Sequence, residues 1–85
     1  MSLKIFYVYI MVNPDGRHYI GTSSDIEARL KKHNSKSSEW TRFRGPWELV
    51  YKEEFETKHE ALLRERVIKS YKGGRAFKKL LKTIR

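Results

Sequence analysis

The stretch KIFYVYIMVNPDGRHYIG, residues 4–21, determines the fold because it predicts a β-hairpin. Lys4–Val12 is mostly apolar or aromatic on both alternating faces, which is typical of a strand buried on both sides. Asn13–Gly16 is a strong turn sequence, since proline presets φ and glycine accepts the left-handed region. Arg17–Gly21 then returns as a second, antiparallel strand.

Two tyrosines of this hairpin are predicted to lie close together. A four-residue turn places Tyr9 within about one residue of directly opposite Tyr19, where cross-strand side chains can touch. The pair could form one site, or the two rings could only pack the hairpin.

A helix that carries two cations on its inward side is expected next. Ser24–Glu27 has the pattern of a capping box, so the helix begins there and runs to about His33. Arginine and histidine on a core-facing stripe cost stability unless they face a partner or a cleft. That stripe, at i, i+3, i+4 and i+7, consists of Ile26, Arg29, Leu30 and His33.

The remaining elements complete a small α+β domain. Asn34–Pro46 is expected to be a loop, and Trp47–Phe55 a third strand. Thr57–Glu60 is a second capping box, opening a helix that should end at Gly73-Gly74, and Arg75–Ile84 predicts a last amphipathic helix. The order β-β-α-β-α-α predicts a three-stranded, mostly antiparallel sheet flanked by helices.

Length and composition limit the class of protein. Residues 1–85 make one domain, because a chain of 85 residues has no room for a second core. The absence of cysteine excludes disulfide-linked partners and cysteine zinc sites, and a reducing cytoplasm is the simplest location. The apolar run Leu3–Val12 is too short to span a membrane.

The net charge of +9 is concentrated at the carboxy-terminal end. Residues 1–63 carry ten Lys and Arg against nine Asp and Glu, whereas residues 64–85 carry nine against one. This asymmetry favours a polyanionic partner, with nucleic acid first, over a solubilising face or an acidic membrane surface. The basic residues expected to contact nucleic acid are Lys36, Arg42, Arg44, Lys69, Arg75, Lys78, Lys79 and Lys82.

Two spaced triplets carry a family resemblance. Tyr7-Val8-Tyr9 and Tyr19-Ile20-Gly21 are followed by Arg29 and His33, one helical turn apart, and then by Glu65 among apolar neighbours. This ordered set resembles the GIY-YIG nuclease family, in particular the short stand-alone bacterial members related to the amino-terminal nuclease domain of the DNA-repair excinuclease. That family has the same β-β-α-β-α-α arrangement.

The resemblance covers about Phe6 to Lys69 and departs from the family at three places. Tyr7 stands where the first triplet of the family has glycine, and Thr22 stands where several family nucleases carry lysine. Many members also have an asparagine 12–15 residues after the glutamate, where this chain has Phe77–Leu80.

The resemblance implies a metal-dependent endonuclease that acts on DNA and selects structure more than sequence. Tyr19 would take the proton of the attacking water, and Tyr9 would orient its partner within the site. A tyrosine ionises near pH 10, and a cation within a few ångströms lowers the pKa of such a hydroxyl by about 1–3 units. Arg29 can supply that cation and also hold a phosphate oxygen. His33 would contact phosphate or donate a proton.

Glu65 matches the metal-binding glutamate of the family. One carboxylate, with water and phosphate oxygens, suits a single Mg²⁺ or Mn²⁺ ion. The alternative is a salt bridge from Glu65 to Arg29 or to a neighbouring basic residue.

Two other classes of function stay open from the sequence. One is a non-catalytic nucleic-acid-binding module that retains the fold, with RNA as well as DNA as a possible ligand. The other is a protein-interaction domain that uses the Trp40–Trp47 surface. A protein partner that supplies targeting is compatible with the nuclease, because the short family members lack separate DNA-binding domains.

Overall fold

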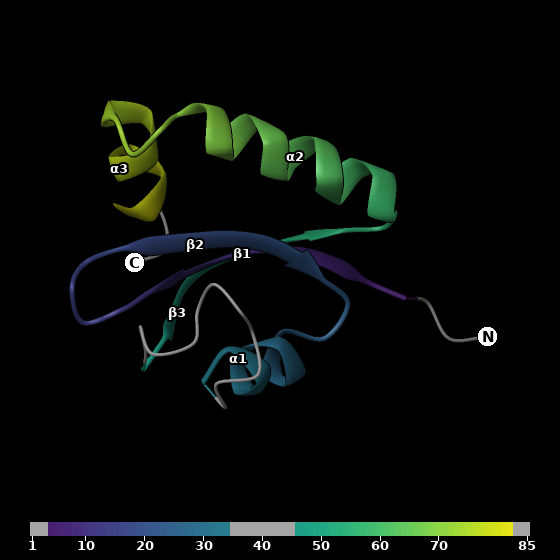
Figure 1. Cartoon of the computed structure of the whole chain (residues 1–85). Coiled ribbons are helices and arrows are strands. Elements are labelled where there is room, and N and C mark those ends of the chain that lie inside the picture. Colours follow the sequence, from purple (N-terminus) through teal and green to yellow (C-terminus); the bar gives the residue numbers. More distant parts are fainter. Residues whose placement is uncertain (1–3, 35–45, 83–85) are drawn as a thin grey trace.

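The computed structural model describes residues 4–34 and 46–82 and has the predicted order of elements (Figure 1). The strand and helix boundaries expected from the sequence are correct to within about three residues. The elements are β1 (Phe6–Val12), β2 (His18–Ser23), α1 (Ile26–Asn34), β3 (Glu48–Phe55), α2 (Lys58–Ser70) and α3 (Arg75–Lys82).

The sheet is antiparallel throughout, in the order β2-β1-β3. In Figure 1, α2 and α3 cover one face and α1 covers the other. Because β1 is central and covered on both faces, Val8, Tyr9, Ile10 and Met11 are all 0% exposed. This explains why the first strand is apolar at successive positions rather than at alternate ones.

Alternate residues of β1 belong to two separate core clusters. Val8 and Ile10 pack under α2 and α3 with Ile68 and Phe77. A second cluster, on the α1 face, consists of Tyr9, Met11 and Trp47, with Tyr19, Ile26, Leu30 and Leu49 packed against it.

The register of the hairpin differs from the prediction. Tyr9 lies opposite Gly21, and Tyr19 lies opposite Met11, so the tyrosines are two positions apart rather than one. The cause is the side chain of Asn13, whose Oδ1 accepts hydrogen bonds from the backbone N–H groups of Asp15 and Arg17 at 3.1 and 2.8 Å. Arg17 therefore belongs to the turn, but the tyrosines still share a face because side chains alternate along a strand.

The helix starts depend on capping groups. In α2 the predicted cap is confirmed, since Glu60 N–H donates to the Thr57 hydroxyl at 3.1 Å. In α1 the cap is Asp25 rather than Ser24, because Ala28 N–H donates to the Asp25 carboxylate at 3.1 Å.

The helix ends also differ from expectation. Helix α2 ends at Ser70, before the two glycines, and the following Lys72 and Gly73 have positive φ values of 50° and 74°. Ile84, expected on the apolar stripe of α3, lies outside the described residues.

Helix α2 is fixed to the sheet by an ion pair. The Arg64 guanidinium donates to both carboxylate oxygens of Glu53 on β3, at 3.0–3.1 Å. The same carboxylate accepts a hydrogen bond from the Tyr51 hydroxyl. This network fixes the helical turn that carries the next residue, Glu65. Within residues 4–34 and 46–82, no helix is long and apolar enough to cross a membrane.

Candidate functional site

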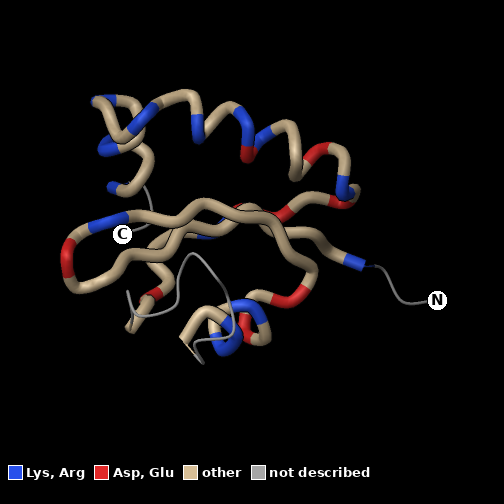
Figure 2. Tube along the Cα trace, viewed as in Figure 1, with Lys and Arg blue, Asp and Glu red and all other residues tan. Residues whose placement is uncertain are grey.

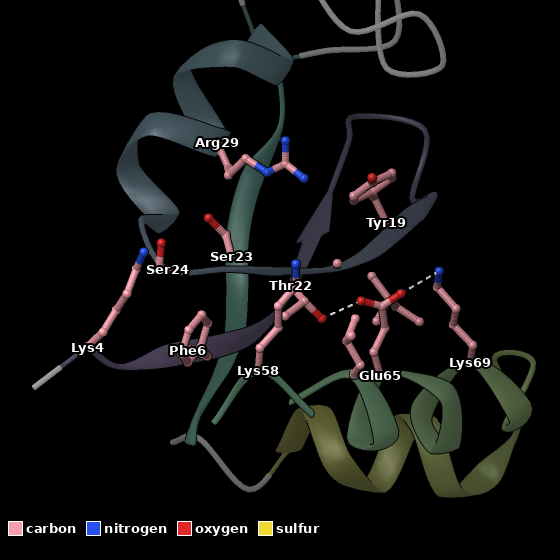
Figure 3. Close-up of a pocket in the computed structure, with 13 residues that line it drawn as sticks. Lys4, Phe6, Tyr19, Thr22, Ser23, Ser24, Arg29, Lys58, Glu65 and Lys69 are labelled. Atoms are coloured by element: carbon pink, nitrogen blue, oxygen red, sulfur yellow. Dashed lines mark hydrogen bonds and ion pairs between the residues drawn. The ribbon is translucent and has the colours of Figure 1, made fainter. Parts of the chain in front are cut away.

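A pocket of about 590 Å³ lies over the edge strand β2, between α1 and α2 (Figure 3). Tyr19–Ser23 of β2 form its floor. Side chains of an edge strand alternate between the two faces of a sheet, so this floor presents groups to both helices. In Figure 3, Arg29 comes from α1 and Glu65 from α2, on opposite sides of β2. The pocket therefore joins the two faces at the edge of the sheet.

The structure brings most of the predicted site residues to this pocket. Tyr19, Arg29, Glu65 and Lys69 line it. Tyr9 is 0% exposed and lies behind β2 on the α1 face, so it supports the pocket from below rather than lining it.

Gly21 allows Tyr9 to approach β2 closely. A Cβ atom at Gly21 would lie 2.6 Å from the Tyr9 hydroxyl and 3.0 Å from the Tyr19 ring. Any larger residue would therefore push the two tyrosines away from the strand. The glycine of the second triplet has a steric role that its sequence position alone does not reveal.

Burial keeps the Tyr9 hydroxyl protonated at neutral pH. Desolvation, followed by the charge of Tyr19, raises the pKa of Tyr9 to about 12, although the Arg29 guanidinium acts in the opposite direction. The hydroxyl lies 3.4 Å from Nε2 of His33, within hydrogen-bonding distance. Tyr9 is therefore suited to position its neighbours and is a poor base.

His33 is a buried, neutral support for the tyrosines. Its side chain is 4% exposed, and burial, then Arg29 and Lys32, lower its pKa. Its ring packs against that of Tyr19 with centroids 4.6 Å apart. His33 is absent from the lining of the pocket, so this geometry favours contact with Tyr9 and Tyr19 over direct contact with phosphate.

Both carboxylate oxygens of Glu65 have partners. Oε1 accepts a close hydrogen bond from the Thr22 hydroxyl, and Oε2 forms an ion pair with Lys69 Nζ at 2.8 Å. The side chain is 18% exposed and points into the pocket (Figure 3). The salt bridge considered as an alternative from the sequence is thus present, with Lys69, in the same residue that faces the pocket.

The donor set fits a hard cation that keeps most of its water ligands. Within residues 4–34 and 46–82, no three His, Asp or Glu residues cluster as a ready metal cage. Glu65 is the one carboxylate among the described pocket residues. A single carboxylate with water and substrate phosphate oxygens suits Mg²⁺ or Mn²⁺, which needs few protein ligands.

Two pocket cations were missed from the sequence. Lys4 precedes β1 and Lys58 begins α2, and both line the pocket with Arg29 and Lys69. Each resembles an ordinary exposed lysine in the sequence, and only the tertiary fold brings them together. Four cations and one carboxylate thus surround the pocket among the described residues, which favours an anionic ligand.

Other predicted nucleic-acid contacts lie elsewhere. Figure 2 shows Lys and Arg positions gathered on α3, at the opposite end of the molecule from the amino terminus. Of the predicted residues, Lys36, Arg42 and Arg44 lie outside the described ranges. Those on α3, all exposed and away from the pocket lining, are Arg75, Lys78, Lys79 and Lys82.

Trp47 does not form an exposed interaction surface. It is 3% exposed and packs in the cluster on the α1 face, with its backbone held on both sides by the Asn34 amide at 2.6 and 3.1 Å. Trp40 lies outside the described residues. The predicted Trp40–Trp47 surface is therefore wrong for Trp47, which is a core residue.

Comparison with known proteins agrees with this geometry. The sequence pattern of the GIY-YIG catalytic domain matches residues 5–78. A UPF0213 protein of Staphylococcus saprophyticus is 44% identical over 73 residues, which cover 85% of this chain and 89% of that protein. A UPF0213 protein of Staphylococcus epidermidis is 48% identical over 66 residues, covering 76% and 80% of the two chains.

A solved structure has the same fold. The solution NMR structure of the UPF0213 protein BH0048 from Bacillus halodurans matches with a TM-score of 0.55 and 38% sequence identity, covering 95% of this chain and 85% of that one. These relatives, like this chain, are small, and the domain pattern covers most of the sequence. The chain belongs to the GIY-YIG family.

Proposed function

We propose that this protein is a metal-dependent endonuclease that hydrolyses phosphodiester bonds in DNA and selects its substrate by shape more than by sequence. One observation carries the proposal: Tyr19, Arg29 and Glu65 come from three different elements and line one cationic pocket. Membership of the GIY-YIG family supports nuclease chemistry at this site.

Each group has a role in hydrolysis by water. The water oxygen forms a bond to phosphorus as the bond to the leaving sugar oxygen breaks. Ionised Tyr19 takes a proton from the attacking water, and the leaving oxygen takes its proton from solvent. Arg29 donates charge-assisted hydrogen bonds to the non-bridging phosphate oxygens. Tyr9 and His33 hold the Tyr19 ring from behind, because both are buried and neutral at pH 7.

Glu65 would hold the divalent cation. When bound, Mg²⁺ or Mn²⁺ would offset the negative charge of the phosphate and stabilise the leaving oxygen. The Thr22 hydroxyl fixes the orientation of the carboxylate, and Lys69 offsets its charge in the free protein. Lysine is common at the Thr22 position in family nucleases, so here Lys69 provides the cation that Thr22 lacks.

Binding outside the pocket would use the backbone of the nucleic acid. The exposed basic residues of α3 carry charge on a short helix of two turns, which supports phosphate contacts that do not depend on base sequence. DNA is the proposed substrate, with RNA as the comparison ligand.

The test is cleavage of labelled single-stranded and branched DNA by purified protein with Mg²⁺ or Mn²⁺. We expect nicking that stops with EDTA and is lost in Glu65→Ala, while DNA affinity is unchanged or higher because the carboxylate repels phosphate. Lys52→Gln, an exposed lysine outside the pocket, is the matched control and should cut normally. Equal cleavage by Glu65→Ala and wild type would remove Glu65 from the metal site.

A second function is favoured by the contacts of Glu65. Because Thr22 and Lys69 already engage both of its oxygens, the pocket could serve a nucleic-acid-binding module without chemistry. The same assay separates the two: salt-sensitive binding of every DNA form without nicking under any metal condition would favour the binding module.

A further inference from the structure

The pocket is longer than one phosphate group requires. Its floor runs from Tyr19 to Ser23 of β2, and four steps along a strand cover roughly 13 Å. The axial rise per nucleotide in one strand of B-form DNA is about 3.4 Å. A nucleic-acid strand that lies along β2 would therefore place more than one nucleotide in the pocket.

The two ends of the pocket differ in chemistry. Tyr19, Glu65 and Lys69 lie at one end, and Lys4, Phe6 and Ser24 lie at the other (Figure 3). The second set, which we call the Phe6 end, has a cation, a hydroxyl and an aromatic ring. Among its described residues it has no carboxylate and no base, so it is suited to binding rather than to bond cleavage.

One face of the Phe6 ring is open to the pocket. Lys4 is exposed, and its ammonium group lies over the ring at 5.8 Å from the centroid, near the outer limit of a cation–π contact. The rest of Phe6 packs against the core cluster that contains Val8 and Ile10. A ring that is fixed on one side and covered on the other by a loosely held ammonium group can accept a stacked base.

A similar lysine–aromatic pair on the other face of the sheet has different surroundings. Lys52 Nζ lies 5.6 Å from the centroid of the Tyr7 ring. That depression is lined by Asp25 and Glu27, whose carboxylates repel phosphate. Of these two pairs, only the one at the Phe6 end has an open ring, neighbouring cations and continuity with the candidate catalytic groups.

We infer that the Phe6 end is a subsite for the nucleotide that flanks the cleaved bond in a single strand of nucleic acid. The base stacks on Phe6, as bases stack on aromatic residues in proteins that bind single strands. The displaced Lys4 ammonium group, with the Ser24 hydroxyl, contacts the flanking phosphate. This subsite rests on the proposed nuclease function of the same pocket, and it makes single-stranded or locally unpaired DNA the preferred substrate.

The test measures binding without cleavage. Fluorescence anisotropy in EDTA compares the affinities of labelled di- and hexathymidylate for the wild type, Phe6→Leu and Lys4→Gln. Leucine retains the apolar packing of Phe6 and removes the stacking surface, and Lys4 is exposed, so its substitution leaves the fold intact. Tyr7→Leu and Lys52→Gln are the matched controls from the acidic depression.

We expect Phe6→Leu to weaken hexathymidylate binding about five-fold or more, with dinucleotide binding nearly unchanged. Lys4→Gln should reduce the slope of log K against log[salt] by about 0.7, the value for one lost phosphate contact in a single strand. The control variants should stay within about two-fold of the wild type. The subsite is wrong if both pocket variants bind hexathymidylate like the wild type, or if the controls weaken binding equally.

Cleavage distinguishes failure of the subsite from failure of the proposed function. If hexathymidylate binding ignores Phe6 while metal-dependent nicking still requires Glu65, the nuclease proposal stands and the subsite falls. If the Phe6 dependence is observed but nicking is absent, the subsite stands as a binding site and the nuclease proposal falls.

Discussion

The two faces of the sheet share one buried strand but bury different chemistry. On the α2 face, Val8 and Ile10 meet Ile68 and Phe77 in an apolar cluster. On the α1 face, the alternate residue Tyr9 meets His33, with a hydroxyl and an imidazole that need hydrogen-bond partners. Burying polar groups costs free energy unless they are paired, so an arrangement of this kind indicates a function on that face. The comparison teaches that one face supplies stability and the other supports the site.

The largest effect on stability should come from the apolar face. Ile68 is 0% exposed, so Ile68→Ala should lower the free energy of unfolding by about 2–5 kcal/mol through lost contacts and a cavity. Urea denaturation measures the loss. Well below its melting temperature, the variant should cut DNA at the wild-type rate. Slower cleavage by the folded variant would mean that the two faces are not separable.

The next effect tests close packing at the edge of the polar face. Gly21→Ala should cost about 1–3 kcal/mol, because the new methyl group would lie 2.6 Å from the Tyr9 hydroxyl. It should also reduce cleavage, since the two tyrosines must move. Denaturation and single-turnover kinetics together measure both losses. An unchanged melting temperature and rate would show that the tyrosines are not held by this contact.

Alkaline pH should weaken both faces, but only one substitution should affect cleavage. Burial raises the pKa of both Tyr9 and Tyr51 to about 12. A raised pKa means that the folded protein keeps a proton that the unfolded chain loses, so stability is retained below pH 10 and falls as the pH rises from 10 to 12. Urea midpoints between pH 9 and 11 should fall less steeply in Tyr9→Phe and in Tyr51→Phe than in the wild type.

The two phenylalanine variants should differ in activity. Tyr9→Phe should slow cleavage, because its hydroxyl contacts His33 beside Tyr19, whereas Tyr51→Phe should cut normally because its hydroxyl donates to Glu53 on the other face. Equal rates in the two variants would contradict the division between the faces.

The smallest effect concerns Lys69. Its ammonium group lies 2.8 Å from Glu65 Oε2 and competes with a divalent cation for that oxygen. Lys69→Ala should therefore bind Mn²⁺ a few-fold more tightly in the absence of DNA, measured by electron paramagnetic resonance. Lys31→Ala removes the same charge from α1, outside the pocket, and should leave Mn²⁺ affinity unchanged. Weaker Mn²⁺ binding in Lys69→Ala would place the cation away from Glu65.

Local signals explain how much of the fold could be predicted. The strand β1, the turn at Asn13–Gly16 and the cap at Thr57 each depend on a few adjacent residues, and each is confirmed. The register could not be predicted correctly, because the side chain of Asn13 recruits Arg17 into the turn. A hydrogen bond from one side chain thus shifted the pairing of the whole hairpin by one residue.

The site was only partly predictable for a similar reason. Tyr19, Arg29 and Glu65 carry a recognisable spacing, and the structure brings them to one pocket. Lys4 and Lys58 join them through tertiary proximity alone, which no local pattern encodes. The burial of Trp47 was also missed, since an aromatic residue beside a basic segment looks like a surface residue in sequence.

The central claim is that the edge of β2 brings a tyrosine base to a phosphate, and Tyr19→Phe tests it most directly. The substitution keeps the ring packed against His33 and removes one hydroxyl, so it should change stability by at most about 1–1.5 kcal/mol. Single-turnover cleavage of single-stranded DNA with Mg²⁺ should slow by about 10²–10⁴-fold with DNA affinity intact. Cleavage by Tyr19→Phe at the wild-type rate would contradict the account.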